Sequence, residues 1–227
     1  MGAFPRFFHT RSKQMYRLHC FCQSGNSYKV ALALRCLGQP WTAVFVDFMN
    51  GVTKAKEWRG EFNEMGEVPI LEDGTLRLTQ SGMILTYLAQ KHKQFGGRDD
   101  GEQREILRWL LFDNHKFSSY FVSYRFMKSF GLTAPDPAVM AWLKGRIDQA
   151  FSVVDRHLQS HRFVLGEDPT IADFSMCGYL FFPEEESGLQ IEQRFPNVRK
   201  WLERIRAMPG WSDPYEILPG QRLAPRW

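Results

Sequence analysis

The sequence predicts an α/β domain followed by an all-α domain, and two patterns carry this prediction. Residues 15–93 alternate strand-like and helix-like segments in the order βαβ-ββα, whereas residues 103–227 space their apolar side chains as helices do. The stretch 94–102, QFGGRDDGE, is polar and rich in glycine, which indicates a linker. We therefore expect an N-terminal arm at 1–14, an α/β domain at 15–93, the linker at 94–102 and a helical domain at 103–227.

The composition is typical of a water-soluble globular protein. Of its 227 residues, 44% are hydrophobic and 24% are charged, which suffices for one large or two small domains. The net charge is +4, but the 29 basic residues are interspersed with 25 acidic ones, so we expect no nucleic-acid partner. No apolar run approaches the ~18 residues of a membrane span. The four cysteines lack the spacing of a disulfide framework, which predicts free thiols in the cytoplasm.

The first fourteen residues differ from the rest of the chain. They include Arg6, His9, Arg11 and Lys13 but no acidic residue. A secretory signal would have a longer apolar run, and a myristoylation signal would have Ser or Thr in place of Arg6. We expect this segment to be an arm that precedes the first domain.

The first domain begins with a strand, a helix and a second strand. Residues 15–21 alternate as a strand does, and a polar turn follows them. The stretch 27–38 has one apolar helical stripe and ends at Gly38, and 41–48 is rich in β-branched and aromatic residues. Because such crossovers are right-handed, the two strands should be parallel neighbours.

A hairpin and a helix complete this domain. The strand-like runs 68–71 and 75–78 are joined through Asp73-Gly74, a dipeptide that favours tight turns. Pro69 has no N–H to donate, so either its strand lies at a sheet edge or the Val68–Pro69 bond is cis. Ser81 then opens an amphipathic helix, where its hydroxyl and the free N–H groups could bind a carboxylate. A plain helix cap is the alternative.

At these motifs the sequence resembles the cytosolic glutathione S-transferases, in particular bacterial, serine-type members similar to the theta, zeta and nu classes. The resemblance rests on Val-Pro before an acid-glycine turn, on QSGMILTYLAQ after it, and on FNEMGEVPIL, which departs from the family's LNPMGKVPVL at Glu64. It implies a thioredoxin-like first domain, a helical second domain, and glutathione as co-substrate without a metal ion.

The resemblance also implies which residues bind glutathione. Val68 and Pro69 would pair with its cysteinyl unit, and Gln80 with Ser81 would hold its γ-glutamyl carboxylate. Lys54 falls where several classes place a side chain that reaches the glycyl carboxylate, although a solvated lysine is the ordinary alternative.

Thiol activation is expected in the turn between the first strand and the first helix. The resemblance gives this role to Ser24, with Asn26 as a second donor. Lowering a thiol pKa by two units takes ~2.7 kcal/mol, which one charge-assisted hydrogen bond and a helix terminus can supply. Ser27 is a rival helix cap, and ordinary turn chemistry would explain all three residues. Cys22 is the alternative found in cysteine-type members, but a Cys-x-Cys pattern on a strand favours a packing role.

The second domain supplies the expected substrate pocket. Aromatic residues crowd its first helical stretch, which in the family faces the sulfur, and we assign Phe112, His115 and Tyr120 to the pocket; core packing and a dimer interface are the alternatives. We expect the tail 219–227 to cover the pocket mouth. Thr170-Ile171-Ala172-Asp173 has the pattern of a capping box, so Asp173 should serve folding rather than catalysis.

The resulting hypothesis is a homodimeric glutathione S-transferase that adds glutathione to a small hydrophobic electrophile, as in detoxification. One alternative uses the same site for glutathione-dependent disulfide or peroxide reduction, which Asn26 supports. Another is a non-catalytic domain that binds a partner, as in elongation-factor and starvation-response relatives of the family. The presence of Ser24 together with Gln80-Ser81 argues against that last alternative.

Overall fold

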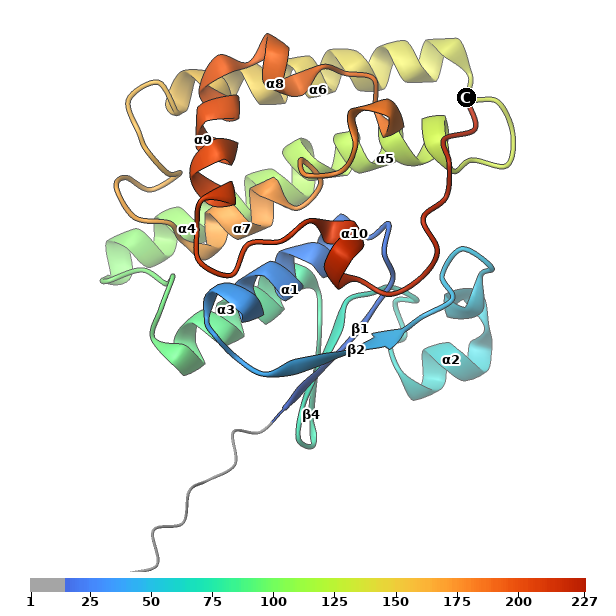
Figure 1. The fold of residues 1–227 in the computed structure, drawn as a ribbon, viewed down its shortest axis with the longest axis horizontal. Coiled ribbons are helices and arrows are strands. Elements are labelled where there is room, and N and C mark those ends of the chain that lie inside the picture. Colours follow the sequence, from blue (N-terminus) through green and yellow to red (C-terminus); the bar gives the residue numbers. More distant parts are fainter. Residues whose placement is uncertain (1–14) are drawn as a thin grey trace, which may run out of the picture.

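The computed structural model describes residues 15–227, and they form a four-stranded sheet with a helical domain above it (Figure 1). The predicted arm at 1–14 lies outside the described residues. The first domain contains β1 Tyr16–Cys20, α1 Gly25–Cys36, β2 Trp41–Phe45, the 3₁₀ turn η1 Val52–Lys54, α2 Lys56–Glu61, β3 Ile70–Asp73, β4 Leu76–Thr79 and α3 Ser81–His92.

The remaining elements are helical, as the sequence predicts. They are α4 Asp100–Phe112, the π-helical turn η2 Asp113–Phe117, α5 Ser118–Ser129, α6 Pro137–His157, α7 Ile171–Cys177, the 3₁₀ turn η3 Glu184–Glu186, α8 Ile191–Arg194, α9 Pro196–Arg206 and α10 Pro214–Ile217. Beyond α3, the only strand-like pairing within 93–227 is an isolated bridge between Phe163 and Gly166. None of the helices within 15–227 combines the length and the apolar character that crossing a bilayer requires.

The sheet has the order β2-β1-β3-β4 and is mixed. β1 pairs with β2 in parallel, and it pairs with β3 in the antiparallel sense. Helices α1 and α3 lie on the side of the sheet that faces the helical domain, where both contact α7 (Figure 1). This is the thioredoxin-like arrangement expected from the order of the elements.

The hairpin between β3 and β4 turns one residue later than predicted. Asp73 still pairs with Leu76, so the two loop residues are Gly74 and Thr75. Gly74 has φ = 64°, a left-handed conformation that glycine adopts without steric cost. The choice left open at Pro69 is also settled, because the Val68–Pro69 bond is cis and β3 lies inside the sheet.

The helical domain packs around aromatic and aliphatic residues of α4 to α9. Phe117 and Phe121 are buried against Phe151 of α6, as the apolar spacing predicts. Val139 of α6 is 42% exposed, because it lies in the first turn of that helix. The capping box at Thr170 and Asp173 is confirmed, and Asp173 also accepts a hydrogen bond from the Trp201 indole (2.9 Å).

A buried ion pair connects the two domains. Lys29 of α1 donates to Asp113 of the π-helical turn (Nζ–Oδ2 2.8 Å), and neither side chain is exposed to solvent. Asp113 also accepts hydrogen bonds from Ser118 and Ser175. The carboxylate therefore has three donors, and it fixes α1 against the helical domain.

Candidate active site

The strand register brings three segments of the chain to one edge of the sheet. His19 of β1 lies beside Ile70 of β3, and Ile70 lies beside Thr79 of β4. In the chain, α1 follows β1, Pro69 precedes β3 and α3 follows β4. The N-termini of both helices and the cis-proline loop therefore meet at this end of the strands, which we call the site edge.

Ser24 caps α1 at the site edge. Its Oγ accepts hydrogen bonds from the Ser27 amide (3.1 Å) and the Ser27 hydroxyl (2.9 Å). Ser27, the rival cap in the sequence, is therefore inside the helix. Because both of these contacts use Ser24 as an acceptor, its own hydroxyl hydrogen remains available to an anion. Asn26 lies in the first turn of α1 and is half-buried.

Close packing fixes the position of this turn. A Cβ atom on Gly25 would lie 2.5 Å from the Tyr179 ring, so the helix start presses directly on α7 and the segment after it. The Ser24 amide donates to the Phe21 carbonyl (3.1 Å), which closes the turn that leads out of β1. Only glycine at position 25 permits this approach.

At the start of α3, Gln80 rather than Ser81 occupies the N-cap position. Ser81 is the first helical residue. Gln80 has φ = 67°, a left-handed conformation that is uncommon for a residue with a side chain and that concentrates at functional sites. No side chain caps this helix, so the Ser81 hydroxyl is not used as a cap, and the first amides are left for a ligand.

Val68 and Pro69 face the same edge from the loop that precedes β3. Val68 is half-buried and Pro69 is buried. Lys54 ends η1, and the loop that carries it packs close to the segment before the proline, because a Cβ on Gly66 would lie 2.8 Å from the Thr53 carbonyl oxygen. Lys54 is exposed and has no ion-pair partner among residues 15–227. It is therefore free to reach an anion at the site edge.

The cysteines near the site are poor candidates for thiolates. Cys22 is buried in the turn beyond the end of β1, and burial raises the pKa of its thiol. Burial also raises the pKa of Cys20 to about 12. Both thiols are free and stay protonated at neutral pH, which agrees with a packing role.

The residues assigned to the substrate pocket are not brought together. Phe112 packs edge-on against Trp109 in α4, and Tyr120 packs against Trp142 of α6. His115 is exposed on the π-helical turn. None of the described contacts joins these three side chains to the site edge, and their role as pocket residues stays a prediction.

Two cavities lie elsewhere in the described chain. One, of about 1050 Å³, is lined by the last turns of α3, by residues 95–98 and by α4. Since α3 begins at the site edge, its last turns lie at the far end of that helix. The other, of about 370 Å³, lies inside the helical domain beside residues 179–184. Neither is lined by Ser24, Pro69 or Ser81.

The sequence analysis missed the polar residues that support the Ser24 turn. Arg125 of α5 is buried and donates to the Gln23 carbonyl (2.9 Å), one residue before Ser24. It is paired with buried Glu186 (Nε–Oε2 2.8 Å). A charged residue in an amphipathic helix ordinarily faces solvent, so no local signal marked Arg125, and its partner lies far away in the sequence.

Comparison with known proteins gives consistent results. The family model described as the glutathione S-transferase N-terminal domain matches residues 16–90, and the C-terminal domain model matches residues 137–204. Glutathione S-transferase F14 of Arabidopsis thaliana is 29% identical over 208 residues, which are 86% of this chain and 80% of that protein.

Solved structures share the fold. A glutathione S-transferase from Pseudomonas fluorescens Pf-5 is 26% identical, with a TM-score of 0.76 over 88% of this chain and 98% of that one. Ure2p in complex with glutathione is 23% identical, with a TM-score of 0.79 over 91% of this chain and 99% of that one.

Proposed function

The chain belongs to the glutathione S-transferase family, and we propose that it binds glutathione at the site edge and adds it to a hydrophobic electrophile. The observation that carries this proposal is the convergence of the Ser24 hydroxyl, the Val68–Pro69 loop and the open start of α3 on one edge of the sheet. A tripeptide with two carboxylates and a thiol needs this combination of backbone pairing, anion binding and a hydroxyl donor.

Each part of glutathione has a proposed partner. The γ-glutamyl carboxylate would bind at the start of α3, to Ser81 and beside Gln80, where the free amides and the helix dipole favour an anion. The cysteinyl backbone would pair with Val68, and Lys54 would approach the glycyl carboxylate. With these contacts the sulfur would lie near the end of β1, because β3 and β1 are neighbours in the sheet.

Ser24 would then activate the thiol. The thiol loses its proton to solvent, and the Ser24 hydroxyl donates a hydrogen bond to the resulting thiolate. The thiolate attacks the electrophilic carbon, so a carbon–sulfur bond forms and the leaving group or the π-electron pair departs from that carbon. The start of α1 contributes its positive end to the same anion.

Ser24→Ala is the direct test. Loss of one hydrogen bond to a charged sulfur costs about 1.5–3 kcal/mol, which is roughly a ten- to hundredfold loss of transfer rate. Ser27→Ala is the matched control, since it removes the neighbouring hydroxyl and leaves Ser24 as the cap. Thiolate absorbance of bound glutathione, followed against pH, should show a raised thiol pKa only in Ser24→Ala. Equal behaviour of the two variants would refute the role of Ser24.

Disulfide reduction is a second candidate, and Asn26 favours it. No hydrogen bond of the Asn26 side chain occurs within 15–227, so its amide is free to act as a second donor at the sulfur. Calorimetric titration with reduced glutathione and with its disulfide separates the two activities. Tighter binding of the disulfide, with Asn26→Ala reducing only that binding, would favour the reductase, and binding without turnover of either kind would favour a partner-binding domain.

A further inference from the structure

The C-terminal segment after α10 passes directly beside the Ser24 turn. Figure 1 shows it in red, leaving α10 and crossing toward the end of α5. The Gln221 carbonyl accepts a hydrogen bond from the Gln23 side chain (2.7 Å) and from the Cys22 thiol (3.3 Å). Farther along, the Arg226 amide donates to the Ser129 carbonyl (3.2 Å). The tail, residues 219–227, is thus held at both domains.

The tail fits closely where it meets the turn. Gly220 has φ = +118°, and a Cβ there would lie 2.9 Å from the Phe45 ring and 3.4 Å from the Cys22 sulfur. Cys22 is 1% exposed, and the tail is among the segments that cover its sulfur. The position of the tail is therefore specific and is not that of a chain end lying on the surface.

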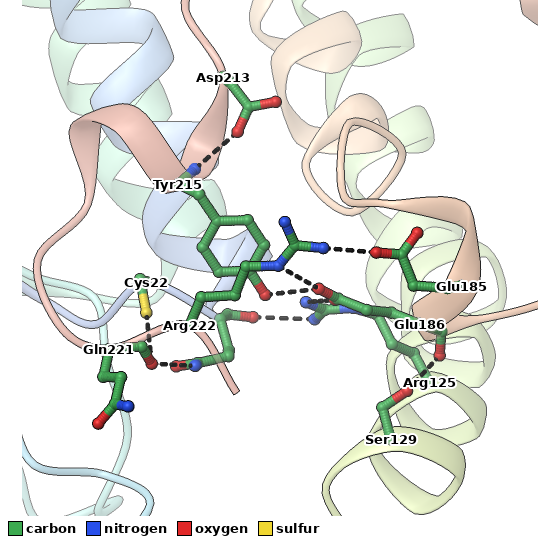
Figure 2. Close-up of polar contacts among 10 residues, drawn as sticks. Cys22, Arg125, Ser129, Glu185, Glu186, Asp213, Tyr215, Gln221 and Arg222 are labelled. Atoms are coloured by element: carbon green, nitrogen blue, oxygen red, sulfur yellow. Dashed lines mark hydrogen bonds and ion pairs between the residues drawn. The ribbon is translucent and has the colours of Figure 1, made fainter. Parts of the chain in front are cut away.

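Arg125 of α5 contacts the same turn from the helical domain, and Figure 2 shows it beside Glu186. Its guanidinium donates to the Gln23 carbonyl and to the Glu186 carboxylate, and it lies 4.0 Å from the centre of the Phe182 ring. Arg125 is 2% exposed and Glu186 is fully buried. A buried guanidinium that donates from all three of its nitrogens has little freedom, so the carbonyl that precedes Ser24 is fixed in place.

Glu186 depends in turn on residues from the C-terminal end of the chain. Its carboxylate accepts a hydrogen bond from Tyr215 of α10 (2.7 Å). Burial raises the pKa of the Tyr215 hydroxyl, which keeps it a donor. Arg222 of the tail pairs with neighbouring Glu185 (2.5 Å) and lies 3.9 Å from Glu186, as Figure 2 shows.

These contacts reach Gln23 by two routes, one at its side-chain amide and the other at its backbone carbonyl. The tail reaches Gln23 directly through Gln221, and α10 with the tail reaches it through Glu186 and Arg125. A hydroxyl must be held to within about 0.5 Å to stabilise a reacting group, and the residues that lock it are as necessary as the hydroxyl itself. The Ser24 amide and hydroxyl already have hydrogen-bond partners within the turn. The peptide unit that precedes Ser24 is therefore the one that depends on contacts from outside the turn.

We propose that the tail and α10 position Ser24 for thiolate binding, with Arg125, Glu186 and Gln221 as positioning residues. This inference rests on the proposed function of the site edge. It predicts that loosening the tail raises the pKa of the bound glutathione thiol even when the substituted residue is far from glutathione and exposed.

The Glu185→Gln variant distinguishes an effect of Ser24 positioning on the thiol pKa from a direct effect of the Glu185 charge. Glu185 is exposed, so the variant should fold, and it weakens the hold on Arg222 by removing the shorter of its two ion pairs. Removal of a nearby negative charge alone would lower the thiol pKa, whereas loss of positioning would raise it, so the two effects have opposite signs. We expect a rise of about half a unit or more in the thiolate titration of bound glutathione. Glu203→Gln is the control, because Glu203 forms an equally exposed pair with Arg199 in α9.

Tyr215→Phe tests the second route without any change of charge. It should raise the thiol pKa in the same way, while Tyr87→Phe, which also removes a hydroxyl bound to a carboxylate, should leave that pKa unchanged.

Alkylation of Cys22 gives an independent readout. Opening of the tail in Glu185→Gln should speed the alkylation of Cys22 about tenfold or more relative to that of half-buried Cys36.

The outcomes distinguish the two proposals. The proposed function stands if wild-type protein binds glutathione as a thiolate and Ser24→Ala raises the thiol pKa. If Glu185→Gln and Tyr215→Phe then leave that pKa unchanged or lower it, the proposal that the C-terminal segment positions Ser24 is wrong. If wild-type protein does not bind glutathione, both proposals are wrong. A raised pKa in both variants together with faster alkylation of Cys22 in Glu185→Gln supports the inference.

Discussion

Replacing Lys29 by methionine tests how the two domains are held together. Lys29 and Asp113 are fully buried, and their contact is 2.8 Å long. The variant fills nearly the same volume but leaves a carboxylate in the interior without its cation. Breaking a buried pair in this way costs about 3–5 kcal/mol. The hydroxyls of Ser118 and Ser175 still donate to Asp113, so we expect the lower end, about 3 kcal/mol.

Equilibrium unfolding in urea, followed by tryptophan fluorescence, measures this loss. About 3 kcal/mol is a large part of the 5–15 kcal/mol that stabilises a typical domain, so the midpoint should fall well below that of the wild type. The double variant Lys29→Met/Asp113→Asn removes the stranded charge. The amide keeps one oxygen that accepts from one hydroxyl and has an NH2 group that donates to the other, so this variant should recover about 2 kcal/mol. A single-variant loss below ~1 kcal/mol, the level of an exposed pair, or a double variant no more stable than the single one would refute the reasoning.

Three further predictions follow from other contacts. Gly25→Ala should lower the unfolding free energy by about 1–3 kcal/mol, because the new methyl group meets the Tyr179 ring. Gly145→Ala in α6 should raise the unfolding free energy by about 0.5–1 kcal/mol, because its methyl group meets open space. Similar urea midpoints for the two variants would contradict this prediction. Burial lowers the pKa of His157, so its contribution to stability is complete above pH ~6.5 and is lost as pH falls below that value. In thermal melts, His157→Gln should therefore flatten the decline of the melting temperature between pH ~7 and ~5. An unchanged slope would count against this role of His157. Thr170→Ala should cost ~1 kcal/mol through loss of the α7 cap, and a neutral result would mean that Asp173 alone sustains the helix start.

Local chemistry explains what could be predicted from the sequence. The order of strands and helices along the chain, the hairpin and the capping box at Thr170 follow from patterns within a few residues, and the structure has all of them. The exact caps were less predictable, since Ser24 and Ser27 are both good N-cap residues and only the backbone decides between them. Gln80 was predicted as a ligand-binding residue, but nothing local indicated its left-handed backbone.

Contacts between distant parts of the chain explain what could not be predicted. Arg125 and Glu186 are 61 residues apart, and each belongs to a residue type that is ordinarily exposed. The aromatic residues of α4 and α5 illustrate the same limit. Their helical spacing predicts a packed face, but Tyr120 turned out to contact α6, because the choice of neighbour depends on how the helices are arranged.

The alignment of His19, Ile70 and Thr79 across the sheet has a consequence for tolerance of insertions. The loop residues Gly74 and Thr75 lie at the other end of the hairpin, beyond the Asp73–Leu76 pair. A peptide tag or a fluorophore-bearing segment inserted between them would lengthen the hairpin away from the site edge and leave the register intact. Deletion of a single residue within β4 would instead shift Gln80 by one position and turn its side chain to the opposite face of the sheet. The hairpin tip is therefore the natural place for labels and for length variation, whereas β4 admits neither.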